Sequence, residues 1–153
     1  MQSGVVLEIA TDSTLHFTGA LAQNAGEGED IALKMEIAAG KHCRCRVKAI
    51  VVQSLENLAW ETWLWGKDTK GVTGNVDTSS LRARWTFVAT DGKRITGDDN
   101  YYYYVDGNDQ PYFDVDMTGE LHITLVNRSA AAKTAGAVGA VSVRLFVELS
   151  QGM

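Results

Sequence analysis

The sequence predicts an all-β protein, an antiparallel β-sandwich of about eight to ten short strands with little helix. Apolar and polar residues alternate with a period of two in many segments, as in strands that are buried on one face. Clusters of Gly, Asp and Asn separate these segments, and the absence of helical periods between them favours antiparallel neighbours. The 153 residues are enough for one core, so we expect a single domain over residues 1–153.

The alternation is most regular in six segments, residues 5–10, 31–38, 42–51, 81–90, 121–125 and 141–149. In the first of them, Val5, Leu7 and Ile9 share one face. In the third, a small apolar face running from Cys43 to Val51 lies opposite a basic face. We expect each segment to pack its apolar face against the core.

Shorter strands are predicted at residues 15–18, 101–105 and 112–117. Residues 58–65 have some helical spacing after Ser54, a candidate N-cap, but their aromatic content favours a strand that ends at Gly66. Residues 129–139 are rich in small side chains, and we expect them to form a long loop.

Turn-forming residues separate the strands, at residues 24–28, 39–41, 91–93, 106–109 and 118–119. Asp91-Gly92 and Asp106-Gly107 are residue pairs that tolerate a positive φ in tight hairpins. These two positions are therefore predicted to be hairpin turns.

Cys43 and Cys45 are two residues apart on one strand, so they point to the same face and a disulfide between them would be strained. We expect both to be small buried side chains in a reducing compartment. A zinc site with His42 is not expected, because His42 points to the opposite face and no second Cys/His pair is present.

Composition and motifs argue against several functions. The net charge of −5 disfavours general nucleic-acid binding, and no apolar stretch is long enough for a membrane span. The first residues lack the pattern of a secretory signal, so we expect synthesis in the cytoplasm. No phosphate-binding or dinucleotide-binding glycine motif is present, and we expect neither a cofactor nor an enzymatic activity.

Three kinds of catalytic or metal site can still be imagined. Asp114 and Asp116 share a strand face near other carboxylates, as in a sugar-cleaving pair, but a solvated acidic face explains them as well. Residues 106–109 are compatible with a calcium loop but lack the EF-hand pattern. His16, His42 or His122 could belong to a Ser-His-Asp triad, yet no Gly-x-Ser-x-Gly elbow accompanies them.

Aromatic residues are the first set of candidate interface residues. Trp60, Trp63 and Trp65 cannot all lie on one strand face. The run Tyr101, Tyr102, Tyr103 and Tyr104 places two rings on each face of its strand. Rings that the core does not need would form a carbohydrate platform or a protein interface.

Basic residues are the second set, with Arg44, Arg46 and Lys48 on one strand and Arg82 and Arg84 on another. They could pair with acidic residues such as Asp114 and Asp116 across a sheet. Otherwise they would form a docking patch for an acidic neighbour.

Residues 119–129, the following small-residue loop and residues 141–149 resemble the closing strands of small jelly-roll head decoration (cement) proteins of tailed bacteriophages. Residues 49–52, which lead into Trp60–Trp65, share this resemblance. It implies a jelly-roll sandwich that forms homo-oligomers, often trimers, on the outside of the capsid and clamps adjacent subunits of the major capsid protein. It carries over no catalytic residue and no cofactor.

The expected function is therefore capsid decoration, with residues 1–10 as an N-terminal arm or an edge strand. Two alternatives stay open. One is a carbohydrate-binding sandwich that uses the tryptophans or the tyrosine run, and the other is a tail, collar or fibre component of the virion.

Overall fold

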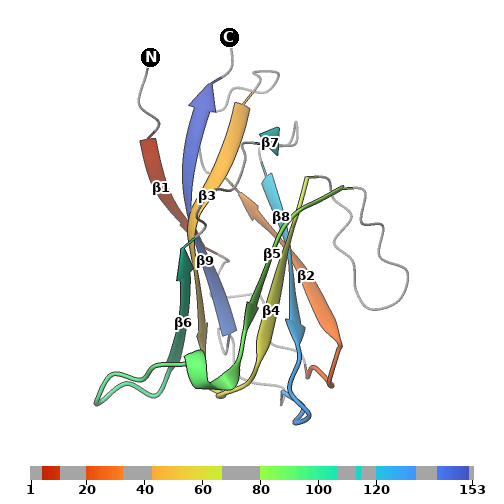
Figure 1. The fold of residues 1–153 in the computed structure, drawn as a ribbon, viewed down its shortest axis with the longest axis vertical. Coiled ribbons are helices and arrows are strands. Elements are labelled where there is room, and N and C mark those ends of the chain that lie inside the picture. Colours follow the sequence, from red (N-terminus) through yellow and green to blue (C-terminus); the bar gives the residue numbers. More distant parts are fainter. Residues whose placement is uncertain are drawn as a thin grey trace.

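The computed structural model describes residues 5–10, 20–32, 43–66, 80–106, 113–114, 120–133 and 141–151. Their strands form two antiparallel sheets that lie face to face (Figure 1). The five-stranded sheet has the order β1 (Val5–Ala10), β9 (Val141–Gln151), β3 (Cys43–Ser54) and β6 (Tyr101–Asp106), and β7 (Phe113–Asp114) also pairs with β3. The four-stranded sheet has the order β2 (Gly26–Ala32), β8 (Glu120–Asn127), β4 (Trp60–Trp65) and β5 (Leu81–Phe87). The predicted antiparallel β-sandwich is confirmed.

The strand pairs are nested along the chain. The innermost pair, β4 with β5, and the pair β2 with β8 belong to the four-stranded sheet. The pairs β3 with β6 and β1 with β9 belong to the five-stranded sheet. This order is that of one long antiparallel hairpin that is rolled so that successive strand pairs alternate between the two sheets.

The core lies between the sheets and contains large apolar side chains from both. Trp60 and Leu64 of β4 meet residues such as Ile50 of β3 and Leu145 of β9, all of them fully buried. The rings of Phe87 and Tyr103 are in edge contact across the sandwich, with centroids 6.0 Å apart. Burial of each large apolar side chain contributes roughly 1.5–3 kcal/mol to the stability of the folded state.

A β-bulge in β3 changes which residues of this strand face the core. The pairing of β3 with β9 shifts between Val47 and Ala49, so Lys48 is an extra residue. Beyond it, Ile50 and Val52 are fully buried, whereas Val51 is only partly buried. The predicted single apolar face from Cys43 to Val51 is therefore wrong after Val47, because one inserted residue reverses the alternation.

Strand β2 begins earlier than predicted. Gly26 and Gly28 were expected in a turn, but both belong to the strand and pair with Val126 and Thr124 of β8. A Cβ atom at Gly26 would lie 3.1 Å from methyl carbons of both neighbours, so the glycine allows close packing. The turn is confined to the residues before it, where Asn24 has a φ of 63°.

Residues 88–100, which we call the β5–β6 loop, project from the sandwich at the lower left of the view (Figure 1). A short 3-10 helix, η2 (Ala89–Asp91), opens the loop. Gly92 has a φ of −67°, so its predicted role as a positive-φ turn residue is wrong. Gly97 has a φ of 91° and takes that role.

Several predicted segments fall wholly or partly outside the described residues, namely 15–18, 33–38, 39–41, 107–109, 112, 115–119 and 134–139. Within the described part of the chain, no helix is both long enough and apolar enough to cross a membrane.

Candidate functional site

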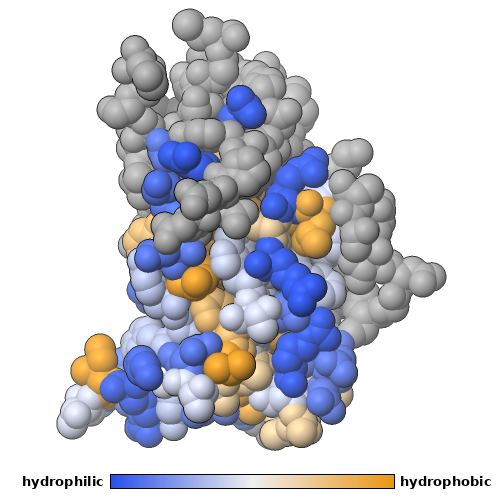
Figure 2. Space-filling view, viewed as in Figure 1, coloured by the Kyte–Doolittle hydropathy of each residue, from blue (hydrophilic) through white to orange (hydrophobic). Residues whose placement is uncertain are grey.

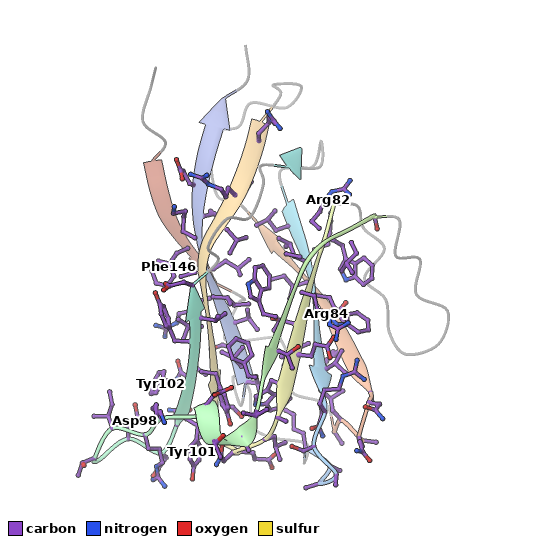
Figure 3. All side chains as sticks on the ribbon, viewed as in Figure 1. Arg82, Arg84, Asp98, Tyr101, Tyr102 and Phe146 are labelled. Carbon is purple, nitrogen blue, oxygen red and sulfur yellow. The ribbon has the colours of Figure 1, made fainter. Side chains whose placement is uncertain are left out.

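The outer faces of the two sheets present most of the predicted interface residues, on opposite sides of the sandwich. Arg82 and Arg84 lie on the outer side of the four-stranded sheet, whereas Tyr102 and Phe146 lie on the outer side of the five-stranded sheet (Figure 3). Each outer face is a separate candidate site because the core fills the space between them.

The three tryptophans of β4 divide between the core and the outer face, as the sequence predicts. Trp60 is fully buried in the core, so its ring is not available to a partner. Trp63 and Trp65 point outward and are in edge contact, with ring centroids 5.8 Å apart. Trp65 is only 1% exposed and donates a hydrogen bond from Nε1 to the Thr124 hydroxyl at 2.9 Å. Trp63, which is partly exposed, is thus the tryptophan that can meet a partner.

A buried carboxylate beside Trp63 organises the outer face of the four-stranded sheet. The side chain of Glu61 is only 3% exposed, and its Oε1 accepts a hydrogen bond from Nε1 of Trp63 and forms an ion pair with Nε of Arg84. Its Oε2 accepts a hydrogen bond from Nε of Arg128 at 2.6 Å. We call these four residues the arginine–tryptophan cluster. Both arginines are held by Nε, so part of each guanidinium group still faces outward.

The charge state of the cluster follows from these contacts. Burial of Glu61 opposes its ionisation, but the hydrogen bonds from Arg128 and Trp63 and the positive charges of Arg128 and Arg84 outweigh it and lower the pKa of Glu61. The carboxylate is therefore ionised at neutral pH and keeps the two guanidinium groups in place.

The position of Arg128 limits what Trp63 can bind. The Arg128 guanidinium carbon lies 5.8 Å from the centroid of the Trp63 ring, in a cation–π contact. Its Nη1 also donates to Oδ1 of Asn24 at 2.9 Å. The arginine covers part of the ring, so this face is better suited to a partner with negative charge than to the flat stacking of a neutral sugar.

The outer face of the five-stranded sheet carries the second candidate site. Tyr101 and Tyr103 point inward, and Tyr103 is fully buried. Tyr102 and Tyr104 point outward beside Gln53 and Val51 of β3, which confirms the predicted division of the run. We call the outward set of Tyr102, Tyr104, Arg144 and Phe146 the tyrosine face.

Hydrogen bonds fix both outward tyrosine rings. The Tyr102 hydroxyl donates to Oδ2 of Asp98 at 2.6 Å, and the Tyr104 hydroxyl donates to Oδ1 of Asp106. The hydrogen bond to Asp98 raises the pKa of Tyr102, and the bond to Asp106 raises the pKa of Tyr104. Tyr104 is nevertheless 60% exposed, so a fixed aromatic ring faces the solvent.

Neighbouring polar groups complete the tyrosine face. Nη2 of Arg144 donates to Oε1 of Gln53 at 3.1 Å, which holds the guanidinium between β9 and β3. Oδ1 of Asp98 accepts hydrogen bonds from both the backbone and the side chain of Asn100. The hydrogen bond from Tyr102 and those from Asn100 lower the pKa of Asp98. The β5–β6 loop is thereby tied to the tyrosine face.

The basic residues of β3 are mostly paired with acidic neighbours on the same sheet. Arg46 donates to Glu148 of β9 at 2.6 Å, and Lys48 lies 3.9 Å from the same carboxylate. Arg44 is exposed and lies opposite Asp114 of β7 in the register. These contacts favour the simple pairing interpretation for β3, whereas Asp116 lies outside the described residues.

Sequence reasoning missed the residues that hold the two sites together, above all Glu61, Arg128, Asp98, Arg144 and Phe146. A carboxylate within an aromatic strand is a usable signal for Glu61, because burial of a charge requires a partner. The partner itself could not be named, because Arg128 is 67 positions away in the sequence.

Candidate chemical groups do not assemble elsewhere in the described part of the chain. The Cys45 thiol is fully buried in the core, and His122 is 1% exposed on β8. Among the residues with described positions, no group of three His, Cys, Asp or Glu side chains could hold a metal ion.

Comparison with known proteins does not place the chain in a family. No family model matches the sequence, and no curated protein is significantly similar to it.

Proposed function

We propose that this chain is a virion structural protein, a head decoration protein that binds the outside of a phage capsid and stabilises it by bridging major capsid subunits. The observation that carries the proposal is the tyrosine face, where fixed aromatic rings and an arginine lie on an open sheet surface. The nested strand pairs support a jelly-roll interpretation of the sandwich, and the closing strands resemble those of decoration proteins.

The composition of the tyrosine face is that of a protein interface. Tyr, Phe and Arg are enriched in protein interfaces, whereas Lys and Glu are depleted there. The hydroxyl groups of Tyr102 and Tyr104 are already hydrogen-bonded, so docking would cost little side-chain entropy. Stabilisation of a shell by such a surface needs only buried contact area and no chemical step.

The test uses purified protein and expanded capsids that lack it. We expect co-sedimentation with the capsids and a higher temperature of capsid disruption when the protein is bound. The variant Tyr104→Ala should weaken binding about tenfold, because truncation of an aromatic anchor commonly costs more than 1 kcal/mol. Leu55→Ala is the matched control, since Leu55 is 47% exposed but lies outside the tyrosine face. Capsids that neither bind the protein nor gain stability would refute the proposal.

A carbohydrate-binding module is the second candidate, and one observation favours it. Tyr102 and Tyr104 lie two residues apart on the same face, with polar groups of Gln53 and Arg144 beside them. Sugar-binding surfaces combine flat rings with such polar groups. A glycan panel read by intrinsic fluorescence tests this candidate, and Tyr104→Ala should abolish any response. No change in fluorescence with any glycan of a broad panel would leave the virion role as the better explanation.

A tail, collar or fibre location is the third candidate, because the same sandwich could serve at any of these positions. Immunogold labelling of intact virions separates it from a head location. We expect label over the head. Label confined to the tail would contradict head decoration and favour a tail component instead.

A further inference from the structure

The β5–β6 loop is an ordered projection whose end combines an apolar and an acidic side chain. The backbones of Lys93 and Tyr102 exchange two hydrogen bonds of 2.9 and 2.8 Å, which close the base of the loop. Near the end, the backbone N–H of Asp98 donates to the Ile95 carbonyl at 2.9 Å. The loop therefore keeps a defined shape, and although Asp98 is tied to Tyr102 of β6, Ile95 and Asp99 remain exposed to solvent.

Two side chains near the end of the loop, Ile95 and Asp99, are exposed to solvent. Ile95 is 67% exposed, and the Asp99 side chain is 91% exposed although its Oδ1 lies 3.3 Å from Nη2 of Arg94 in an ion pair. An ion pair this exposed contributes little, so Asp99 can exchange Arg94 for another cation. In the space-filling view the loop extends away from the body and carries hydrophobic surface near its end (Figure 2). Singly exposed apolar residues are common on monomers, but Ile95 stands near the end of an ordered projecting loop, which is where binding residues are often found.

The opposite side of the same chain offers a complementary surface. Trp63 is partly exposed there, next to Arg84 in the register of β4 and β5. Arg82 lies two residues from Arg84 on the same strand face, is exposed, and makes no ion pair with any residue the structure describes. Among the described side chains around Trp63, the three arginines Arg82, Arg84 and Arg128 outnumber the single carboxylate of Glu61, so this patch is locally positive in a chain of net charge −5.

We propose that the β5–β6 loop of one copy docks on the outer face of the four-stranded sheet of a second copy. Ile95 would contact Trp63, and Asp99 would lie beside Arg82. The Trp63 ring matches the apolar Ile95, and the exposed Arg82 offers Asp99 a cationic partner in place of Arg94, so charge complementarity would set the register of the contact.

The placement of the two surfaces determines the kind of assembly. Asp98 of the loop and the Arg82 and Arg84 pair lie on opposite sides of the molecule (Figure 3), so the loop reaches only another copy. The contact is heterologous, with different surfaces on the two partners, and repetition of such a contact closes into a ring when the rotation allows. The interface goes beyond capsid binding, because it forms between copies of this chain alone.

The test is a charge exchange read by molecular mass in solution. Light scattering on the purified full chain at low ionic strength should show a mass above that of two copies, which falls as salt is added. Arg82→Glu and Asp99→Arg should each weaken association at least about tenfold, because each places like charges opposite each other. The double variant Arg82→Glu with Asp99→Arg should restore association. Arg44→Glu makes the same change of net charge on the other sheet and should leave the mass unchanged.

Circular dichroism and thermal melting of every variant identify any that fail to fold. A second variant, Ile95→Ser, removes the apolar contact at an exposed position and should also lower the mass. A wild-type monomer at all concentrations, or a double variant as weak as the single ones, would overturn the proposal. These results leave the capsid-binding assay untouched, so failure of one proposal is distinguishable from failure of the other.

Discussion

Replacement of Glu61 by Gln tests whether the buried carboxylate holds the outer face of the four-stranded sheet together. Gln has nearly the same shape, so the packing around it should be preserved. It removes the negative charge that accepts hydrogen bonds from Arg128 and Trp63 and forms an ion pair with Arg84. The amide can still accept from one side, but its NH₂ group would face a guanidinium donor.

The magnitude follows from the burial of the three groups. Loss of one partner from a fully buried ion pair costs 3–5 kcal/mol, but the side chains of Arg84 and Arg128 are 59% and 34% exposed and can be rehydrated. We therefore expect Glu61→Gln to lower the free energy of unfolding by about 2 kcal/mol. For a domain of this size, that corresponds to a fall in Tm of about 4–8 °C.

The pH dependence supplies the sign of the effect. The pKa of Glu61 is lowered in the folded state, so its stabilisation is present above its unfolded value of 4.5 and is lost as the pH falls through the folded value. Urea unfolding at pH 7 should separate Glu61→Gln from the wild type, and the gap should narrow in acid.

The control for this prediction is Arg84→Gln. It removes only an exposed partner and should cost less than about 1 kcal/mol. A Glu61→Gln protein as stable as the wild type at pH 7, or a gap of constant size down to strongly acidic pH, would refute the reasoning.

Three further predictions concern the core and the loop. Gly92→Ala should cost about 1–3 kcal/mol, because its Cβ would lie 2.8 Å from Cζ of Tyr103. Gly97→Ala, where nothing lies within 4 Å of the new Cβ, should cost about 1 kcal/mol through its φ of 91° alone, and urea unfolding compares the two. Ile50→Val should lower the free energy of unfolding by about 0.5–1.5 kcal/mol, whereas exposed Leu55→Ala should change it by less than about 0.5 kcal/mol; equal effects would contradict the assigned core. Burial raises the pKa of Tyr103 to about 12, so its contribution to stability is fully present below its unfolded pKa of 10.0 and is lost as the pH rises through about 12. Ultraviolet titration should show one tyrosine that ionises at a higher pH than the others, and Tyr103→Phe should remove that signal.

Local pattern was sufficient for much of the fold. The alternation of Tyr101 to Tyr104 assigned two rings to the core and two to the surface, and the structure places them so. The same period located β9 and the division of the tryptophans in β4. Alternation works in these strands because successive side chains point to opposite faces wherever no residue is inserted into the pairing.

Features that depend on neighbouring strands could not be predicted. The bulge at Lys48 is a property of the pairing between β3 and β9, and no residue type near Lys48 predicts an inserted residue. The assignment of Gly26 to a strand depends on the methyl groups of β8 that cover it. Both errors came from applying a local rule where a contact between distant segments determines the backbone.

The sequence by itself determined the class of fold, the period of its strands and the two sets of residues, aromatic and basic, that exceed the needs of a core. Only the tertiary structure decided which of them share a surface. Arg84 lies on β5 and Arg128 directly follows β8, the two strands that flank β4, and Glu61 joins them because neighbouring strands in a sheet lie side by side wherever they stand in the chain. Pairing between strands is a long-range property, and for that reason the two outer faces could be listed from the sequence but not assembled from it.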